Sequence, residues 1–356
     1  MTRARIPSHM RIECCIQERR LIDNGPQAAA AERAGFDGVW TLENAHDVFA
    51  RLIVAAQSTS RVELTTAIAV AFARNPMSTA IMAWDLQELS GGRFTLGLGT
   101  QVKAHIERRF SMPWSHPAPR MREFLLAIRA IWNTWSSGDP LDFRGDFYTH
   151  TLMSPVFDPG PNPCGPPKLL LAAVGEHMVR VSGEVADGLI CHPFHTERQL
   201  REQVIPTLVR ALADAQRARA SFEVSVPVMV VTGHTQEEMQ HMRNRVAEDI
   251  GFHASTPAYR HVLDLHGWGA LQDEARALVK AGRWNELPGL VDDEVLRTFA
   301  VVGEPAALPR LLGERYRGIA DRLSFYPPEF NDPELFGPMI AELQKIPTGA
   351  LESTDA

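Results

Sequence analysis

The stretch "LSGGRFTLGLGTQVKAH", Leu89–His105, carries the glycine spacing of a phosphate-binding loop. Gly97 and Gly99 follow an apolar run, as a Gly-x-Gly-x-x-Gly dinucleotide fingerprint requires, but Val102 stands where the third glycine would be. Such a fingerprint also opens the first strand–helix unit of its domain, whereas this stretch belongs to the fourth. We therefore interpret the glycines differently. At the end of a buried strand they either leave room for a planar ligand or relieve crowding between strands.

Short apolar runs that predict strands alternate with helix-like stretches along most of the chain. We predict eight strands, at 10–16, 37–42, 61–70, 93–99, 168–174, 187–193, 222–231 and 321–328. We predict helices at 25–36, 47–60, 75–92, 119–135, 176–186 and 196–216, and a helical stretch from 236 to about 301. Strand–helix alternation produces parallel strands, so eight such units favour an α/β fold of the (β/α)₈ TIM-like barrel type over a doubly wound sheet.

The alternation pauses once, and this pause defines the expected domain organisation. Residues from about 100 to 167 hold one clear helix and a segment rich in Pro, Gly and aromatic residues, which we interpret as an insertion after the fourth strand. A chain of this length fits one barrel domain, predicted over 1–345. The polar end of the chain, 346–356, is predicted to be a disordered tail.

Composition excludes several classes of partner. The net charge is −7, so no overall basic field would attract nucleic acid. No run approaches the roughly 18 apolar residues of a membrane span, and no secretory signal follows the basic start of the chain. The four cysteines form no CxxC pair, which favours reduced thiols in a cytoplasmic protein. The 13 histidines show no metal-ligand spacing, so no metal site is predicted.

Several stretches, in order along the chain, resemble the luciferase-like monooxygenase superfamily, and within it the branch that uses coenzyme F420, a deazaflavin. They are "AERAGFDGVWTLE", "STSRVELTTAIAVAFARNPMSTA", "LQELSGGRFTLGLGTQ", "HPAPRMREFLLAIRAIW", "DFRGDFY", "LLLAAVGEHMVRVSGEVADGLICHPF" and "VVGEP". The resemblance implies a TIM-like barrel with an insertion after the fourth strand. It also implies a deazaflavin or flavin held where the strands end.

The end of the second predicted strand, "TLENAHD", is the predicted catalytic segment. Hydride transfer by a deazaflavin requires a neighbouring group that gives or takes a proton. Glu43 matches a position where relatives carry an acidic residue. Relatives often have histidine at the next position, but here it is Asn44, which can form hydrogen bonds but cannot donate a proton to the reaction. His46 follows two residues later. We predict roles for Glu43, Asn44 and His46 over the alternative of ordinary loop residues.

The predicted cofactor contacts come from three further strand ends. By resemblance, the third strand holds a cis peptide bond that is not followed by proline, and spacing from Asn75-Pro76 places it at Ala67-Ile68. Gly99 and Thr100 would form a floor beside the cofactor, with Gln101 at its polar edge. A helix N-terminus binds anions through its free N–H groups, so the junction at Val174, Gly175 and His177 is predicted to hold the cofactor phosphate. Arg74 would add positive charge there, or serve only as a surface arginine.

The resemblance therefore predicts an oxidoreductase that transfers a hydride between coenzyme F420 and a small organic substrate. One alternative is a two-component monooxygenase that uses FMN and O₂. The other is a barrel that binds the deazaflavin without catalysis, which Asn44 in place of histidine would favour. Side chains beyond the fourth and sixth strands are candidates for substrate contact: Met112, Trp114, His116, His192 and His195. A homodimer is expected by resemblance alone.

Overall fold

The computed structural model describes residues 9–326 and 333–348. Its described residues form two compact units. Unit 1 consists of Glu13–Ile190 and Leu208–Glu223. Unit 2 consists of residues 9–12, Cys191–Thr207, 224–326 and 333–348. Residues 1–8, 327–332 and 349–356 lie outside the description, and with them most of the predicted tail.

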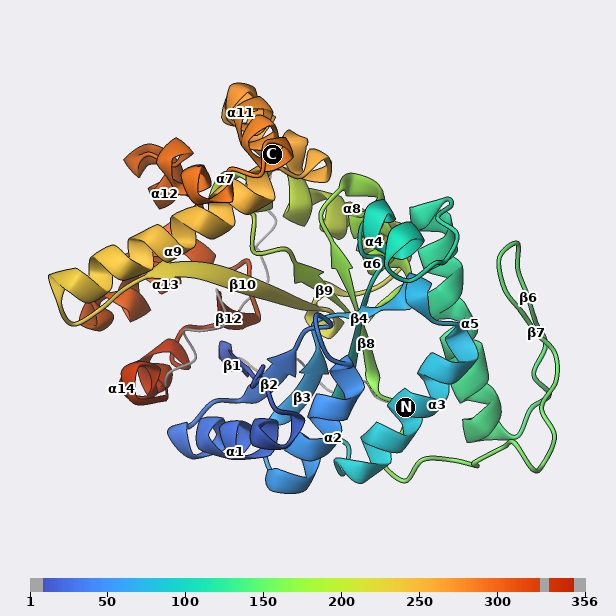
Figure 1. Cartoon of the computed structure of the whole chain (residues 1–356). Helices are drawn as coiled ribbons and strands as arrows, with labels where there is room; N and C mark the ends of the chain where they lie inside the picture. Colours follow the sequence, from blue (N-terminus) through green and yellow to red (C-terminus); the bar gives the residue numbers. More distant parts are fainter. Residues whose placement is uncertain (1–8, 327–332, 349–356) are drawn as a thin grey trace. The chain divides into compact units, whose positions relative to one another are not determined.

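Unit 1 is built on a parallel sheet whose strands follow one another in the order β1-β2-β3-β5-β8-β9 (Figure 1). The strands are β1 (Arg11–Cys15), β2 (Gly38–Thr41), β3 (Glu63–Thr66), β4 (Ala69–Val70), β5 (Phe94–Gly99), β8 (Lys168–Ala173) and β9 (Gly188–Cys191), with β4 paired to β5. All six residues of β5 are buried. This explains its continuous apolar sequence, since parallel strands are covered on both faces.

Two helices of unit 1, α2 (Val48–Ser58) and α3 (Pro76–Leu89), begin at residues whose side chains cap them. The helices of this unit are α1 (Asn24–Ala34), α2, α3, α4 (Lys103–Arg108), α5 (Pro117–Ser137), α6 (Glu176–Val185) and most of α8 (Ile205–Asp214). The side chain of Asp47 accepts hydrogen bonds from the N–H groups of Phe49 and Ala50 and so caps α2. Asn75 caps α3 in the same way, and Pro76 occupies its first position.

The segment between β5 and β8 forms the predicted insertion. It holds α4, α5 and a small antiparallel hairpin of β6 (Phe143–Arg144) and β7 (Thr149–His150), which projects beside α5 in Figure 1. Three large apolar side chains beyond β7 are strongly exposed: Leu152 at 76%, Val156 at 87% and Phe157 at 68%. We call residues 143–157 the apolar arm.

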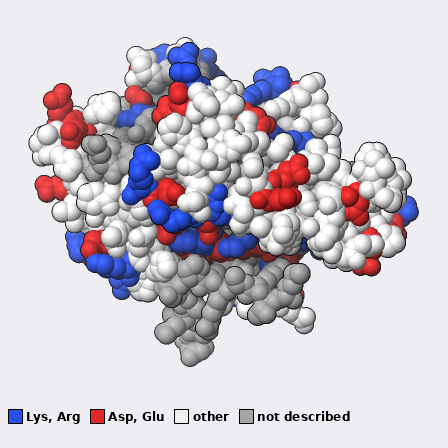
Figure 2. Space-filling view, turned by 90° about the horizontal axis from the view of Figure 1, so that it is seen from below, with Lys and Arg blue, Asp and Glu red and all other residues white. Residues whose placement is uncertain are grey.

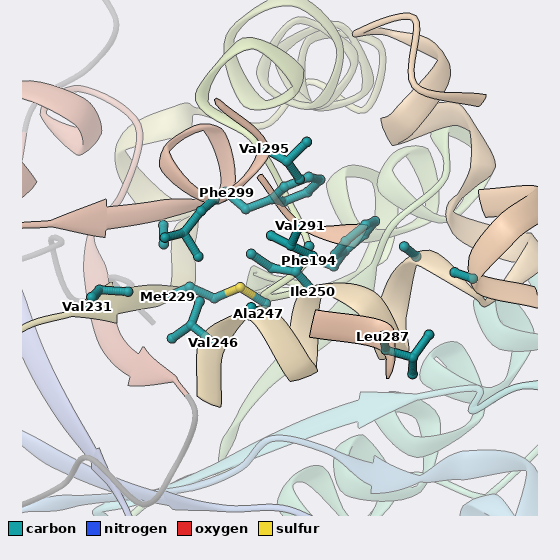
Figure 3. Packing of buried hydrophobic residues seen from close by; sticks show 14 of the residues in the cluster. Phe194, Met229, Val231, Val246, Ala247, Ile250, Leu287, Val291, Val295 and Phe299 are labelled. Atoms are coloured by element: carbon teal, nitrogen blue, oxygen red, sulfur yellow. The ribbon is translucent and has the colours of Figure 1, made fainter. Parts of the chain in front are cut away.

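Unit 2 contains three parallel strands, with β10 (Glu223–Val231) between β11 (Ala300–Val302) and β12 (Arg322–Tyr326). Its helices are α7 (Glu197–Gln199), a π-helical turn (Leu200–Val204), α9 (Gln236–Ala254), α10 (Arg260–Asp264), α11 (Gly269–Lys280), α12 (Asp293–Phe299), α13 (Leu308–Tyr316) and α14 (Pro333–Leu343). A buried apolar cluster joins α9, α12 and β10, with Ile250, Phe299 and Met229 among its members (Figure 3).

Several predicted boundaries differ from the structure. The third predicted strand, 61–70, is two strands, β3 and β4, because the chain turns at 67–68. The predicted helical stretch 236–301 is four helices with 3₁₀ turns between them, and it ends in strand β11 rather than in a helix. The first residues of the predicted disordered tail are ordered: Ile346 is buried, and Pro347 forms a bridge with His9. The short helix α4 was not predicted.

The surface carries charges of both signs. On the face shown in Figure 2, the basic and acidic side chains of the described residues are interspersed. None of the helices among the described residues is both long and apolar enough to cross a membrane.

Candidate active site

The carboxyl ends of the unit 1 strands carry most of the predicted site residues. The strand register pairs Thr41 with Thr66, Ala69 with Leu98 and Gly97 with Leu170, so these parallel strands end at one edge of the sheet. Glu43, Asn44 and His46 follow β2, Arg74 follows β4, Gln101 follows β5 and Gly175 follows β8. In a TIM barrel this edge is where active sites are built.

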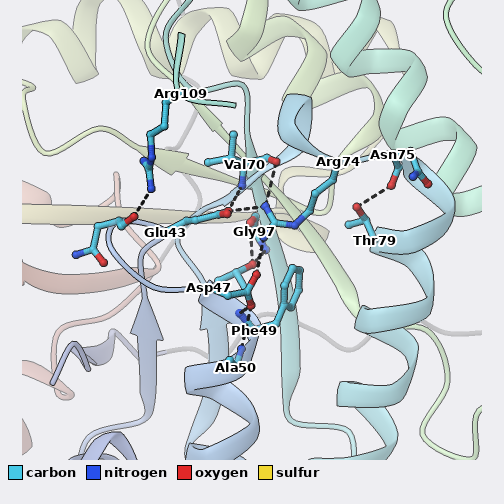
Figure 4. A network of polar contacts seen from close by, with 12 residues as sticks. Glu43, Asp47, Phe49, Ala50, Val70, Arg74, Asn75, Thr79, Gly97 and Arg109 are labelled. Carbon is cyan, nitrogen blue, oxygen red and sulfur yellow. Dashed lines mark hydrogen bonds and ion pairs between the residues drawn. The ribbon is translucent and has the colours of Figure 1, made fainter. Parts of the chain in front are cut away.

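Glu43 is a buried carboxylate held by two donors. Its Oε2 accepts hydrogen bonds from the N–H of Val70 at 2.7 Å and from Nη1 of Arg74 at 2.6 Å, and its side chain is 8% exposed. Arg74 also reaches Oδ2 of Asp47 at 2.8 Å, and Figure 4 shows the three charged groups together. Charge-assisted hydrogen bonds of this length hold a carboxylate firmly in one position. The geometry therefore suits Glu43 to holding the turn after β4 in place.

The charge of Arg74 is fully balanced by these acids. Burial alone would lower the pKa of Arg74, but its hydrogen bonds and ion pairs with Glu43 and Asp47 outweigh burial and raise the pKa. Its guanidinium group also lies over the ring of Phe49, at 5.4 Å from the ring centre. Arg74 thus links β2, β4 and α2, and little of its charge is left for a cofactor phosphate.

Asn44 and His46 are the exposed members of the predicted catalytic segment. Oδ1 of Asn44 accepts hydrogen bonds from the N–H of Ala45 at 2.7 Å and from Nη1 of Arg51 at 3.3 Å. Its carbonyl oxygen accepts a hydrogen bond from Arg109, which follows α4 (Figure 4). His46 is exposed on the same loop.

Arg51 holds this loop through hydrogen bonds from its buried side chain, and no pattern in the sequence predicts this role. The side chain is 2% exposed, and Nη1 lies 3.5 Å from Oγ1 of Thr41 and 3.3 Å from the carbonyl oxygen of Leu42. Burial lowers the pKa of Arg51. In the sequence Arg51 is a single charge inside an apolar helix, which ordinarily indicates a solvated position.

The peptide bond between Ala67 and Ile68 is cis, as predicted. The space next to Gly99 is occupied: a Cβ atom there would lie 2.9 Å from the side chain of Ile68 and 3.5 Å from Ala172. Gly97 is more tightly confined, since its Cβ would lie 2.0 Å from the carbonyl oxygen of Thr66. Of the two interpretations left open for Gly97, relief of crowding is therefore the one that its surroundings support.

Thr100 and Gln101 form a tight turn after β5. The hydroxyl of Thr100 donates to the carbonyl oxygen of Gln101 at 3.0 Å, and Oε1 of Gln101 accepts from the N–H of Val102 at 2.9 Å. Gln101 has a φ of 61°, a left-handed conformation that is uncommon for a residue other than glycine. The turn is thus held by its own side chains, with both residues half-buried.

The junction between β8 and α6 is open. Val174 is half-buried, whereas Gly175 and His177 are exposed. Gly175 is the N-cap of α6, and nothing lies within 4 Å of where its Cβ would be. The first-turn N–H groups of a helix attract anions. Glu176 stands in that turn, but it pairs with Arg180 at 3.7 Å, which offsets part of its charge.

Unit 2 contains a group of histidine and tyrosine side chains in which His253 is buried and His192 and Tyr259 are half-buried. Nδ1 of His192 accepts a hydrogen bond from the N–H of Phe194 at 3.1 Å, so its proton lies on Nε2, 3.0 Å from the hydroxyl of Tyr259. The ring of His253 packs edge-on against His192 at 4.8 Å. Burial, followed by the neighbouring histidines, lowers the pKa of His192 well below its usual value, and burial raises that of Tyr259 to about 12.

His192 is among the predicted substrate contacts, whereas Tyr259 is not. Tyr259 lies in a short 3₁₀ turn after α9, and no sequence motif surrounds it. Among the described residues, no group of three or more His, Cys, Asp or Glu side chains is arranged to hold a metal ion.

Comparisons with known proteins show the family and the fold of this chain. The family model for luciferase-like monooxygenases matches residues 15–322. A Mycobacterium tuberculosis protein of uncharacterised function is 52% identical over 296 residues, which cover 83% of this chain and 87% of the relative. Another protein of that organism, named provisionally as a coenzyme F420-dependent oxidoreductase, is 29% identical over 296 residues, covering 78% of this chain and 82% of its own.

A solved structure, the coenzyme F420-dependent tetrahydromethanopterin reductase of Methanopyrus kandleri, superposes with a TM-score of 0.79. It is 19% identical in sequence, and the match covers 95% of this chain and 99% of that one. The predicted α/β TIM-like barrel with an insertion after the fourth strand is thereby confirmed, as is the resemblance read from the strand ends.

Proposed function

Because this chain belongs to the luciferase-like monooxygenase family, we propose that it is an oxidoreductase that transfers a hydride between coenzyme F420 and a small organic substrate. The observation that carries the proposal is the carboxyl edge of unit 1, where the ion-paired turn at Glu43 and the open junction at Gly175 follow strands that end on the same side of the sheet. The relative named as an F420-dependent oxidoreductase supports the choice of cofactor.

The residues of this edge fit a bound deazaflavin. Gly175 leaves its surroundings free for close approach of a phosphate to the first turn of α6, with Val174 and His177 on either side. Ala67, Ile68, Gly99, Thr100 and Gln101 would border the ring. When bound, the deazaflavin supplies or accepts the hydride. Glu43 and Arg74 then act as positioning residues, because they fix the turn that follows the cis peptide bond.

A proton must accompany the hydride, and one side chain on this edge of unit 1 is suited to move it. His46 is exposed on the loop after β2, and its imidazole can give a proton to the substrate or take one from it. We propose His46 for this role, with Asn44 hydrogen-bonding the substrate or the ring.

An anaerobic assay tests the proposal. Purified protein is mixed with reduced coenzyme F420 and a panel of ketones, enones and imines, and oxidation of the cofactor is followed by absorbance. Turnover without O₂ that falls about 10²-fold or more in His46→Ala would support the proposal. Turnover only with FMNH₂ and O₂ would instead identify the monooxygenase that the family name suggests. Tight deazaflavin binding without turnover on any substrate would indicate a non-catalytic barrel.

We further propose that the protein acts as a homodimer in the cytoplasm. The apolar arm exposes Leu152, Val156 and Phe157 to water, and a second copy of the chain would cover them. None of the four cysteines forms a disulfide, which supports a reducing compartment.

A further inference from the structure

Arg120 is a buried cation without an acidic partner. It lies in the first turn of α5, and its side chain is 8% exposed. Among the residues that the structure describes, no carboxylate forms an ion pair with it. Its partners are neutral: Nε donates to the hydroxyl of Tyr148 at 2.9 Å, and Nη1 donates to the carbonyl oxygen of Pro113 at 2.8 Å. A buried charge is ordinarily paired, so this guanidinium is incompletely satisfied.

Aromatic rings hold the guanidinium group in place. Its central carbon lies 4.3 Å from the centre of the Phe72 ring and 5.8 Å from that of Tyr148. Trp114 packs edge-on against Phe72 at 5.6 Å. Stacking on rings fixes the plane of an arginine side chain while leaving its edge free to form hydrogen bonds.

The nearest acid along the helix is already engaged. Glu123, one turn further along α5, accepts hydrogen bonds from the N–H groups of Asp146, Phe147 and Tyr148. The carboxylate of Glu123 therefore holds the loop that carries Tyr148 and forms no ion pair with Arg120.

The remaining nitrogen of Arg120 points to a ligand. Nη2 has no hydrogen-bond partner among the described residues. It is not one of the fully buried polar atoms, so part of it is accessible to solvent. We propose that Arg120, set on Phe72 and Tyr148, is a binding subsite for an oxyanion, either a carboxylate or a phosphate. Planar guanidinium edges bind such groups through paired, charge-assisted hydrogen bonds.

The subsite adjoins the candidate active site within unit 1. Phe72 lies in the 3₁₀ turn that follows β4, two residues from Val70, whose N–H is bound by Glu43. The oxyanion belongs either to the acidic tail of the cofactor or to the substrate. This assignment of the ligand rests on the proposed function, whereas the existence of the subsite does not.

Binding of simple anions tests the subsite without any cofactor. Phosphate, pyrophosphate and glutarate are titrated into the full chain by calorimetry at low ionic strength. We expect the wild type to bind at least one of them and Arg120→Gln to bind it about tenfold more weakly or worse. The matched control is Arg122→Gln, on the same helix, where the arginine is exposed and pairs with Glu184 at 2.9 Å; its affinity should be unchanged.

Two results would overturn the proposal: no binding of any probe to the wild type, or equal binding to Arg120→Gln. If Arg120→Gln does not fold, Arg120→Lys decides the matter. It keeps the charge but loses the paired donors, so binding should weaken several-fold, and unchanged affinity would refute the subsite.

The source of the anion is then distinguished with the deazaflavin itself. If Arg120→Gln weakens binding of intact coenzyme F420 but not of the tail-free deazaflavin nucleoside, the ligand is the tail. If it weakens neither and raises the KM of an acidic substrate, the ligand is the substrate. Anion binding by a protein that binds no deazaflavin would reject the proposed function and leave the subsite standing.

Discussion

The carboxylate of Glu43 is shared between a backbone N–H and a guanidinium group, and this arrangement has measurable consequences. Removing Arg74 would leave a carboxylate that is 8% exposed without its counter-charge. An uncompensated buried charge is destabilising, so removal of Arg74 should lower the free energy of unfolding and also disturb the shape of the site.

We predict that Arg74→Gln lowers the free energy of unfolding by about 3 kcal/mol, the lower end for a broken buried pair, because Arg74 itself is 17% exposed. Urea unfolding measures the change. The matched control is Arg180→Gln, which breaks the exposed pair with Glu176 and should change stability by less than about 0.5 kcal/mol. Equal effects of the two variants would contradict the structural role given to Arg74.

The buried histidines of unit 2 predict a pH dependence of stability. Burial lowers the pKa of His195 and of His253 from 6.5 to about 4. Below pH 6.5 the unfolded chain therefore binds protons that the folded chain does not, and stability falls as pH decreases toward 4. Carboxylates scarcely titrate between pH 7.5 and 5.5. Over this range, acidification should lower the free energy of unfolding by about 1 kcal/mol for each of these histidines.

Urea unfolding at the two pH values checks this expectation. His253→Gln should remove the contribution of this one ring, about 1 kcal/mol, and leave the contributions of His192 and His195, whose pKa values are also lowered by burial. Stability that stays constant or increases on acidification to pH 5.5 would show that these rings are not buried in the neutral form.

At the scale of elements, two glycines at the ends of parallel strands serve opposite purposes. Gly97 is enclosed by the carbonyl oxygen of Thr66 and by Ile190, at 2.0 Å and 2.7 Å from the position of an added Cβ. Gly175 is open, with a φ of −90° that any residue can adopt. The first is needed for packing between strands, and the second is free to admit a ligand.

The substitutions Gly97→Ala and Gly175→Ala separate these purposes. Gly97→Ala should destabilise the protein by about 3 kcal/mol or more or prevent its folding, because backbone must move to admit the methyl group. Gly175→Ala should change the free energy of unfolding by less than about 0.5 kcal/mol and yet weaken cofactor binding. Thermal unfolding measures the change in stability, and a cofactor titration measures the change in affinity. A Gly97→Ala protein as stable as the wild type would contradict the close packing around Gly97.

The sequence predicts the strands of this fold well, for a physical reason. Strands β5, β8 and β9 are largely apolar, as a parallel sheet covered on both faces demands, and β5 and β8 begin or end within a residue of the prediction. The third strand was predicted as one piece, since the residues on either side of the cis peptide bond are equally apolar.

The site was predicted less completely. Glu43 and Arg74 are recognisable as polar residues after strands, but their pairing depends on contacts between residues 31 positions apart. No sequence motif marks Arg51, Arg120 or Tyr259. The position of each side chain depends on hydrogen-bond partners from other segments of the chain. Prediction from sequence thus gathered the candidate residues at one edge of the sheet, and the structure was needed to separate the ion-paired groups from the exposed ones.

At the scale of the whole molecule, the apolar arm predicts assembly. Replacing Leu152, Val156 and Phe157 with serine should shift the protein from dimer to monomer, since their burial would supply much of the apolar contact. The matched control replaces Phe252 and Trp284, which are exposed in unit 2 at 47% and 50%, with serine. Analytical ultracentrifugation distinguishes the states. A wild-type monomer, or a dimer indifferent to the arm, would contradict the proposal.

We propose above all that the carboxyl edge of unit 1 binds a deazaflavin. The most direct test is a titration of the purified protein with oxidised coenzyme F420 and, separately, with FMN, followed by quenching of cofactor fluorescence. We predict binding of coenzyme F420 with a Kd of about 1 μM or tighter, FMN binding at least about tenfold weaker, and loss of F420 affinity in Gly175→Ala. A clear preference for FMN, or binding of neither cofactor, would contradict this proposal.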